Sequence, residues 1–130
     1  MGINTVLDVQ NIEKHYGKPP NELSVLNKLS LKVKRGEKIA IMGASGSGKT
    51  TLLNLLGGLD DPDYGSISVC EKNWSKLSIS ERATWRNQHV GFVYQFHHLL
   101  EEFSALENVA LPLLIACLLY TSDAADEFSC

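Results

Sequence analysis

The sequence predicts an α/β fold, and three observations lead to this prediction. Residues 39–42 form a short apolar run of the kind found in buried strands. Residues 51–56 carry leucines at helical spacing, and a glycine-rich loop joins the two segments. Short runs in which apolar and polar residues alternate lie on both sides of this unit, which is typical of strands with one solvated face.

The glycine-rich loop is the most specific motif of the chain. Gly43–Thr50 fits the pattern G-x-x-x-x-G-K-[ST] between a strand and a helix, which is the setting of a phosphate-binding P-loop. Glycines allow the backbone to approach an anion closely, and the loop amides and the helix N-terminus form a nest for phosphate oxygens. Lys49 is expected to reach the β- and γ-phosphates, and the Thr50 hydroxyl to ligate Mg²⁺. The predicted nucleotide-binding residues of this segment are Gly43, Ala44, Ser45, Gly46, Ser47, Gly48, Lys49, Thr50 and Thr51.

The elements before the P-loop follow from local patterning. Residues 6–12 predict a first strand, and residues 13–22, with one glycine and two prolines, predict a loop. Residues 29–33 alternate by twos, which indicates a half-buried strand, and residues 34–37 predict a turn.

The segments after the P-loop helix predict two strands and two helices. Residues 66–69 alternate as a short strand, and residues 90–94 predict a second buried strand. Ser78 with Glu81, and Ser104 with Glu107, have the spacing of a capping box. They predict helices over residues 79–88 and from Ser104 through Leu111.

Aromatic and basic residues near the first of these helices have less specific interpretations. Trp74 and Trp85 are predicted to be packing or surface aromatics, and Arg82 and Arg86 to solvate an exposed helix face. The adjacent pair at positions 97 and 98, both histidine, is read as a surface feature, with a metal site as a remote alternative.

Length and charge restrict the class of protein. The 130 residues suit one small domain, and the net charge of −3 comes entirely from three acidic residues after position 116. No basic face or like-charge run indicates nucleic-acid binding. The N-terminus lacks the pattern of a signal peptide, and the longest apolar run, residues 109–120, is too short to span a bilayer. A soluble or peripheral, cytoplasmic protein is expected.

Together with the P-loop, several segments show a resemblance to a known family. The segments Gly57–Gly65 and Val90–Gln95 are similar to the ATP-binding subunits of ABC transporters. Three phrases, Leu55–Asp60, Tyr94–Leu100 and Ala105–Ile115, point within that family to the lipoprotein-releasing subgroup, near the macrolide-export type. The resemblance covers residues 5–116.

The resemblance implies a fold and further site residues. The fold would be a P-loop NTPase core of ABC type with an antiparallel β subdomain, truncated at the start of a helical subdomain after Gln95. Tyr16 matches the A-loop aromatic that stacks on adenine, although a loop tyrosine that packs on the sheet is an alternative. Gln95 matches the Q-loop glutamine, which would touch Mg²⁺ or the attacking water and act in catalysis with Lys49.

The resemblance also implies a biological setting. The parent protein would be an ATPase that uses ATP and Mg²⁺ to drive lipoprotein release. It would work as a homodimer with a second ATP-binding subunit, on integral-membrane permease subunits at the cytoplasmic face of the bacterial inner membrane. No nucleic-acid partner is implied.

The family pattern stops after Ala116. No signature loop of LSGGQ type, no acidic strand with a catalytic glutamate and no switch histidine follows. Residues 117–130 instead resemble the translation of a transposase-type sequencing adapter. We therefore expect residues 1–116 to be the N-terminal part of an ABC nucleotide-binding domain and residues 117–130 to be a non-native tail. A genuine divergent tail is the alternative. The chain is therefore predicted to bind ATP·Mg weakly and not to hydrolyse it.

Other functions remain open from the sequence. The chain could belong to a macrolide-type or other ABC exporter, or to a soluble ABC ATPase of DNA repair or translation. A P-loop kinase or GTPase is a different enzyme class with the same loop. An inert truncated nucleotide-binding fragment is the alternative that involves no enzyme.

Overall fold

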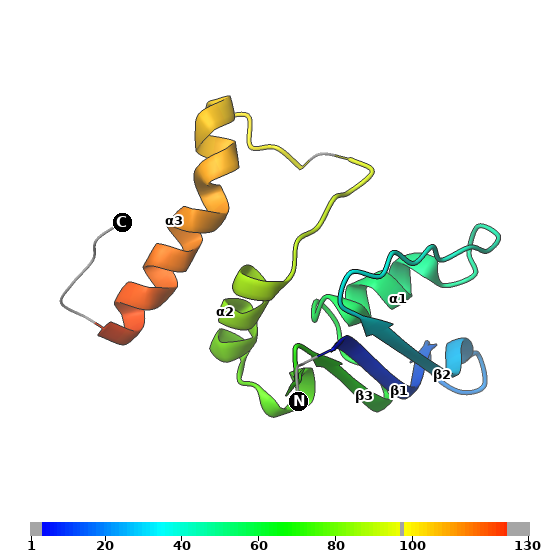
Figure 1. Ribbon diagram of the computed structural model, residues 1–130. Coiled ribbons are helices and arrows are strands. Elements are labelled where there is room, and N and C mark those ends of the chain that lie inside the picture. The colour runs from blue at the N-terminus through cyan, green and yellow to red at the C-terminus, as the bar shows by residue number, and fades with distance from the viewer. Residues whose placement is uncertain (1–3, 97, 125–130) are drawn as a thin grey trace. The chain divides into compact units, whose positions relative to one another are not determined.

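The computed structural model describes residues 4–96 and 98–124. The chain divides into two units, Met1–Ser78 and Ile79–Cys130. The first unit holds every strand found among the described residues, together with helix α1 (Lys49–Leu56), and the second holds helices α2 (Ile79–His89) and α3 (Ala105–Ala124) (Figure 1).

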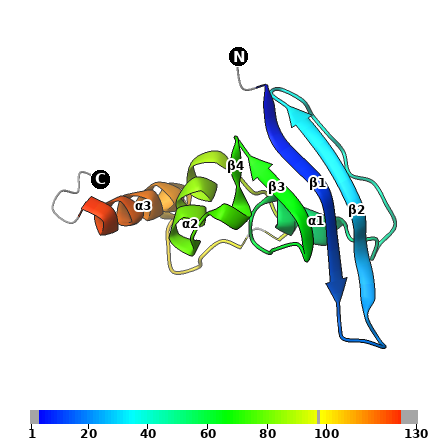
Figure 2. The same ribbon diagram turned by 90° about the horizontal axis from the view of Figure 1, so that it is seen from below.

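A four-stranded antiparallel sheet forms the first unit (Figure 2). Its strands are β1 (Thr5–Tyr16), β2 (Leu23–Lys34), β3 (Tyr64–Val69) and β4 (Lys72–Asn73), in the order β2-β1-β3-β4. The sheet confirms the predicted antiparallel β subdomain. The loop predicted over residues 13–22 is wrong in its first part, because residues 14–16 pair with β2 and only residues 17–22 form the hairpin connection.

A bulge interrupts β1 at Asn11. On β1 Val9 and Ile12 are three positions apart, whereas their partners in β2 are only two positions apart, and the same offset occurs against β3. Asn11 has a φ of 49° and donates its backbone N–H to the Ser30 hydroxyl at 2.9 Å. Gly65 (φ 90°) lies directly beside the bulge, and a Cβ there would be 2.4 Å from the Asn11 carbonyl oxygen. The position therefore requires glycine.

Helix α1 packs against one face of the sheet (Figures 1 and 2). Its buried leucines, Leu52 and Leu55, belong to a core whose other members come from the strands and from the 3-10 helix η1 (Trp74–Lys76). Each such side chain contributes about 1.5–3 kcal/mol by leaving water. The buried core side chains are Val9, Ile12, Leu26, Leu52, Leu55, Ile67, Val69 and Trp74.

Both predicted buried strands are wrong. Residues 39–42 and 90–94 contain no strand, and most of their side chains are exposed. Met42 is 90% exposed and Val93 is fully exposed. A strand forms only where a neighbouring strand donates and accepts its backbone hydrogen bonds. An apolar run indicates that a segment can be buried, but it does not indicate that such a neighbour is present.

Helix α2 confirms the predicted helix and ends one residue later, at His89. The prediction that its arginines solvate an exposed face is wrong, because Arg82 and Arg86 are both half-buried. Burial, and next the charge of Arg82, lower the pKa of Arg86 from its ordinary value. Trp85 stacks on the His89 ring with centroids 3.7 Å apart, which agrees with a packing role.

Helix α3 begins with the predicted capping box. Ser104 Oγ accepts the Glu107 N–H at 3.1 Å, and Glu107 Oε1 accepts the Ser104 N–H at 3.0 Å. The predicted end at Leu111 is wrong, since the helix continues through Pro112 to Ala124. Proline removes one helical hydrogen bond, but the leucine-rich residues after it favour helix. No described helix is long and apolar enough to cross a membrane.

Candidate functional site

The P-loop, Gly43–Thr50, leads directly into α1. Gly48 is the N-cap of the helix, with a φ of 98° that disfavours other residues. A Cβ at this position would lie 2.8 Å from Val25 Cγ1, so Gly48 also allows the loop to lie against β2. The start of α1 is thereby fixed on the hairpin that carries Tyr16.

The start of α1 is free to receive an anion. It has no side-chain cap and no acidic residue in its first turn. Within the described part of the chain, the backbone N–H groups of Gly46 and Gly48 donate no hydrogen bond, whereas the Ser47 N–H donates to the Ala44 carbonyl at 3.1 Å. Unsatisfied N–H groups at a helix N-terminus attract negatively charged oxygens.

Lys49 lies over the loop that it follows. Its Nζ donates to the carbonyl oxygens of Gly43 and Ala44, the latter at 2.9 Å. The ammonium is thus held against the loop, and Lys49 brings a positive charge to the lining of the pocket.

The loop and Tyr16 line one pocket of about 490 Å³. Tyr16 is 43% exposed, so its ring is accessible to a ligand as well as supported by the sheet. The size suits a small-molecule ligand. The lining residues are Tyr16, Val25, Ser45, Gly46, Gly48, Lys49, Thr50 and Thr51.

The remaining predicted site residues have different positions. Gly43 and Ala44 contact Lys49, and Ser47 bonds within the loop, but none of these three lines the pocket. Gln95 belongs to the second unit, on an exposed irregular segment. The predicted Mg²⁺ contact of Gln95 therefore stays a prediction.

Sequence reasoning missed two residues near the pocket. Val25 lines the pocket, and its apolar side chain in an alternating strand gave no functional signal. Lys14 is the second, because its ammonium lies over the Tyr16 ring, 5.4 Å from the centroid. Its position two residues before Tyr16 places both side chains on one face of the strand, which could have indicated the contact.

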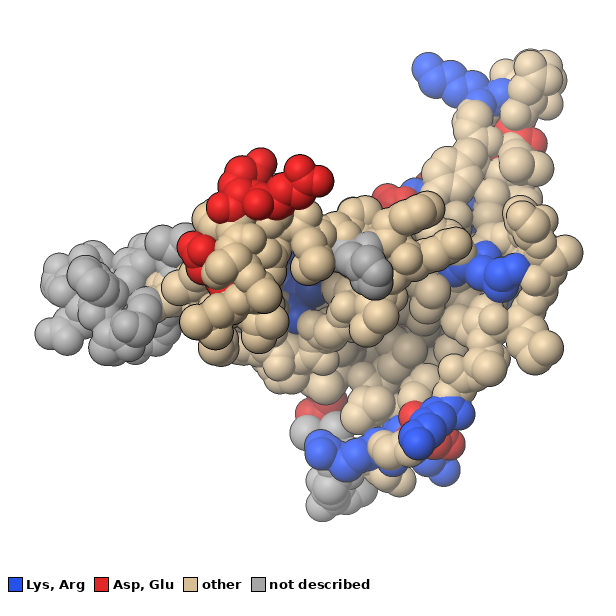
Figure 3. All heavy atoms as spheres, turned by 90° about the horizontal axis from the view of Figure 1, so that it is seen from above, with Lys and Arg blue, Asp and Glu red and all other residues tan. Residues whose placement is uncertain are grey.

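Charged side chains and potential metal ligands also lie outside the P-loop. On the face shown in Figure 3, lysines and arginines occur in separate groups, with acidic side chains beside some of them. Among the described residues, no three His, Cys, Asp or Glu side chains are placed to hold a metal ion. His97 lies outside the described residues, and the ring of His98 meets Tyr94 edge-on. The exposed Thr50 side chain lines the pocket, and its role as a metal ligand stays a prediction.

Comparison with protein families decides the assignment. The family model described as ABC transporter matches residues 26–129. The chain belongs to the ABC transporter family. Membership removes the kinase and GTPase alternatives, which are different P-loop classes. The match also extends into the predicted tail, whose non-native origin stays a prediction.

Curated members of the ABC transporter family are similar to this chain over most of its length. The lipoprotein-releasing system ATP-binding protein LolD of Saccharophagus degradans is 55% identical over 111 residues, which cover 85% of this chain and 49% of that protein. LolD of Acinetobacter baylyi is 52% identical over 110 residues, or 85% and 48% of the two chains. The chain thus spans about half the length of the curated relatives it matches.

Solved structures of ABC cassettes share the fold. The dimeric post-hydrolysis state of the ATP-binding cassette MJ0796, bound to ADP and Pi, matches with a TM-score of 0.78 at 36% identity. A dimeric structure of the same cassette, described as bacterial, matches with a TM-score of 0.79 at the same identity. Both matches cover 85% of this chain and 47% of the solved one. The predicted ABC-type fold class is confirmed.

Proposed function

We propose that this chain is the ATP-binding part of a bacterial ABC transporter subunit that powers lipoprotein release from the inner membrane. The pocket in which the P-loop meets the Tyr16 ring carries the proposal, because it combines an anion nest with an aromatic surface. Identity of about half to the LolD proteins supports the finer assignment.

The triphosphate would bind along the P-loop. The free amides of Gly46 and Gly48 would donate to phosphate oxygens, and the α1 N-terminus adds its partial positive charge. Lys49 would exchange its carbonyl partners, Gly43 and Ala44, for the β- and γ-phosphates. Ser45, Ser47 and Thr51 complete the loop and the first helical turn.

Adenine would stack on Tyr16. The ring lines the same pocket as Lys49 and Thr50, so the base and the phosphates of one nucleotide could occupy it together. A tyrosine offers a flat apolar face with few rotatable bonds, which makes stacking inexpensive in entropy. The alternative, in which Tyr16 only packs on the sheet, is less consistent with its exposure of 43%.

Magnesium would depend on Thr50 and Gln95. Mg²⁺ neutralises phosphate charge and is usually held by few protein oxygens together with the phosphates and water, which fits a pocket whose lining includes the Thr50 hydroxyl and no carboxylate. Thr50 would supply that oxygen. Gln95 would supply a second oxygen or orient the attacking water.

Partners and location follow the same proposal. The transporter subunit would act at the cytoplasmic face of the bacterial inner membrane, on integral-membrane permease subunits. Two ATP-binding subunits would form a homodimer, as dimeric cassettes among the structural relatives suggest. No nucleic acid takes part. A macrolide-type or other ABC exporter remains the second candidate, because it would use the same pocket.

Binding without turnover is expected of the 130 residues alone. The signature loop and the acidic strand with its glutamate are absent from the sequence, so no carboxylate polarises a water for attack. An inert fragment that binds nothing is the competing possibility.

Calorimetric titration of the 130-residue chain with ATP and Mg²⁺ tests the binding site. Lys49→Ala should weaken binding by at least about tenfold, equivalent to 1.4 kcal/mol. Lys18→Ala, which removes the same charge from an exposed hairpin residue, should leave the Kd within about twofold. Absence of any binding contradicts the proposal. Phosphate release that Lys49→Ala abolishes contradicts the expected lack of turnover.

A hybrid protein tests the transported cargo. Residues 1–116 would replace the matching half of a LolD protein, and lipoprotein release from spheroplasts would be measured. The hybrid should support release, and its Lys49→Ala version should not. A hybrid that is active only in a macrolide exporter would favour the second candidate.

A further inference from the structure

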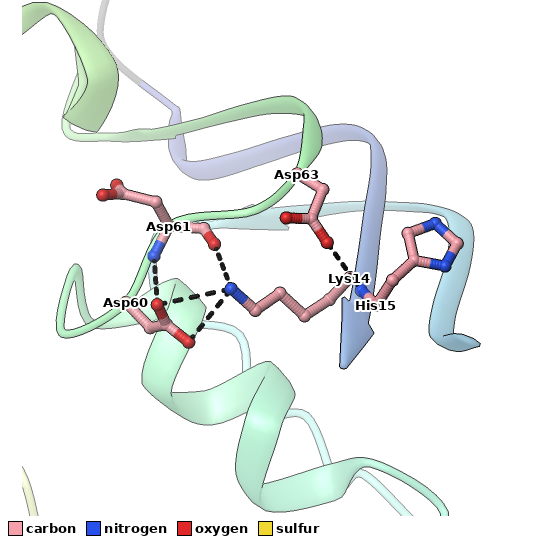
Figure 4. Close-up of polar contacts among 5 residues, drawn as sticks. All are labelled: Lys14, His15, Asp60, Asp61 and Asp63. Atoms are coloured by element: carbon pink, nitrogen blue, oxygen red, sulfur yellow. Dashed lines mark hydrogen bonds and ion pairs between the residues drawn. The ribbon is translucent and has the colours of Figure 1, made fainter. Parts of the chain in front are cut away.

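A cluster of polar residues ties the Tyr16 end of β1 to the loop that follows α1. The cluster consists of Lys14, His15, Asp60, Asp61 and Asp63 (Figure 4). Figure 4 shows the Lys14 side chain extended from the strand to the loop, with Asp60 on one side of its ammonium and Asp61 on the other. All five residues belong to the first unit.

The contacts within the cluster are numerous for one loop. Lys14 Nζ donates to the Asp61 carbonyl oxygen at 2.8 Å and lies 3.3 Å from Asp60 Oδ2. The His15 N–H donates to Asp63 Oδ2 at 2.6 Å, and the Asp63 N–H donates to the Glu13 carbonyl oxygen at 2.8 Å. Residues 13 and 15 therefore bond to the loop through backbone atoms, and Lys14 between them bonds through its side chain.

Lys14 is only slightly exposed although it is charged. Its side chain is 12% exposed, against 43% for that of Asp60. Withdrawing an ammonium from most of its water is costly unless charged and carbonyl oxygens replace that water, and here Asp60 and Asp61 supply those oxygens. The ammonium has little freedom to move, so the strand and the loop are held in one arrangement.

The same ammonium lies over the Tyr16 ring, 5.4 Å from its centroid, which is within cation–π range. Lys14 itself does not line the pocket, whereas Tyr16 does. Lys14 thus contacts the ring from outside the pocket and leaves the ring accessible to a ligand.

We propose that Lys14 is a positioning residue, which fixes the Tyr16 ring for base stacking by joining β1 to the Asp60–Asp63 loop. This inference rests on the proposed nucleotide-binding function. Asp60 follows α1 by four residues, so the loop is tied to the helix that the P-loop begins. Lys14 therefore sets the orientation of the base platform relative to the phosphate site.

The proposal predicts an effect that depends on the base. Calorimetric titrations with ATP and with inorganic tripolyphosphate, both with Mg²⁺, would be compared for the 130-residue chain and its variants. Lys14→Met, which keeps the length of the side chain, should weaken ATP binding about tenfold and leave the tripolyphosphate Kd within about twofold. Lys14→Arg should restore most of the ATP affinity. Lys18→Met is the matched control for lost charge and should change neither Kd.

A second background separates positioning from general damage. In a Tyr16→Leu chain, Lys14→Met should cause no further loss of ATP affinity, because the ring it orients is gone. Asp60→Asn, which keeps the shape of the loop and Lys14 itself, should lower ATP affinity in the same direction as Lys14→Met, by less. It serves as the test if Lys14→Met does not fold by circular dichroism.

Several results would overturn the inference. Equal weakening of ATP and tripolyphosphate, an additional loss in the Tyr16→Leu background, or unchanged ATP affinity in both Lys14→Met and Asp60→Asn would each contradict it. An unmodified chain that binds tripolyphosphate as tightly as ATP contradicts the inference alone. A chain that binds neither ligand contradicts the proposed function as well.

Discussion

The indole Nε1–H of Trp74 donates a hydrogen bond of 3.1 Å to the carbonyl oxygen of Leu56, the last residue of α1. The indole is 3% exposed, and Gly58 lies against its face, where an added Cβ would be 2.8 Å from the ring. A segment 18 residues later in the sequence therefore ends the helix that the P-loop begins, by satisfying one of its free terminal carbonyls.

Gly58→Ala should destabilise the chain more than Gly36→Ala. Both glycines have a left-handed φ, of 75° and 81°, which costs a residue with a Cβ about 1–2 kcal/mol. A Cβ at Gly36 has open space, whereas one at Gly58 overlaps the Trp74 ring, and overpacking adds about 1–3 kcal/mol. Urea unfolding of both variants measures the difference. Equal free energies of unfolding would show that the ring moves aside without cost.

Thr50→Val should remove the gain in ATP affinity that Mg²⁺ provides. Valine has nearly the shape of threonine but no hydroxyl to ligate the ion. Calorimetric titration with ATP in EDTA should give Kd values within about twofold for the two chains, and titration with Mg²⁺ should separate them. Thr84→Val, in the second unit, is the matched control. A Thr50→Val chain that keeps the full effect of Mg²⁺ contradicts this ligand assignment.

Helix α3 should lose helicity at acid pH through Glu107. Hydrogen bonds from the backbone and the side chain of Ser104 lower the pKa of this carboxyl in the folded chain. Since the folded pKa lies below the ordinary value of about 4.3, the stabilisation is complete above that pH and disappears as the pH falls through the lowered pKa. Circular dichroism from pH 7 to 2 measures the loss.

Two glutamate variants isolate this effect. Glu107→Gln should remove its part of the acid transition, whereas Glu102→Gln, at an exposed position three residues before the helix, should titrate like the unmodified chain. Ser104→Ala keeps the backbone N–H, the larger cause, so the pKa of Glu107 should return only partly to its ordinary value in an NMR titration. Identical curves for the two glutamine variants would contradict the capping effect.

Truncation after Ala116 should leave nucleotide affinity within about twofold. Every residue that lines the pocket belongs to the first unit, and the predicted non-native tail begins at Cys117, far beyond it in the sequence. Calorimetric titration of chain 1–116 with ATP and Mg²⁺ tests this expectation. A folded truncated chain that binds at least tenfold more weakly would assign the tail a part in binding.

Features set by neighbouring residues could be predicted from the sequence. The P-loop motif correctly placed a glycine-rich turn before a helix, because Gly48 meets a local backbone requirement. The capping box at Ser104 and Glu107 formed as expected, since both partners lie within one turn. The antiparallel β subdomain followed from alternation and from the family resemblance.

Features set by distant residues could not be predicted in this way. Residues 39–42 and 90–94 have the composition of central strands, yet none of the four strands that the structure describes pairs with them. The chain spans about half the length of its curated relatives, so half of their residues have no counterpart here. Lys14 and Asp60 are 46 residues apart, and neither residue type alone indicates that contact.

The bulge at Asn11 determines which face of the sheet each later side chain of β1 occupies. Val9 and Ile12 are both buried, although regular alternation would place them on opposite faces. Because of the one extra residue, even-numbered side chains after the bulge lie on the face that odd-numbered side chains occupy before it. Beyond it, Ile12, Lys14 and Tyr16 share a face. If the same residues ran as a regular strand without the bulge, Ile12, Lys14 and Tyr16 would lie on the face opposite to Val9, and His15 would lie on the face that Tyr16 now occupies. The side chain that lines the pocket at this end of β1 is thus selected five residues upstream, by one extra residue in the strand.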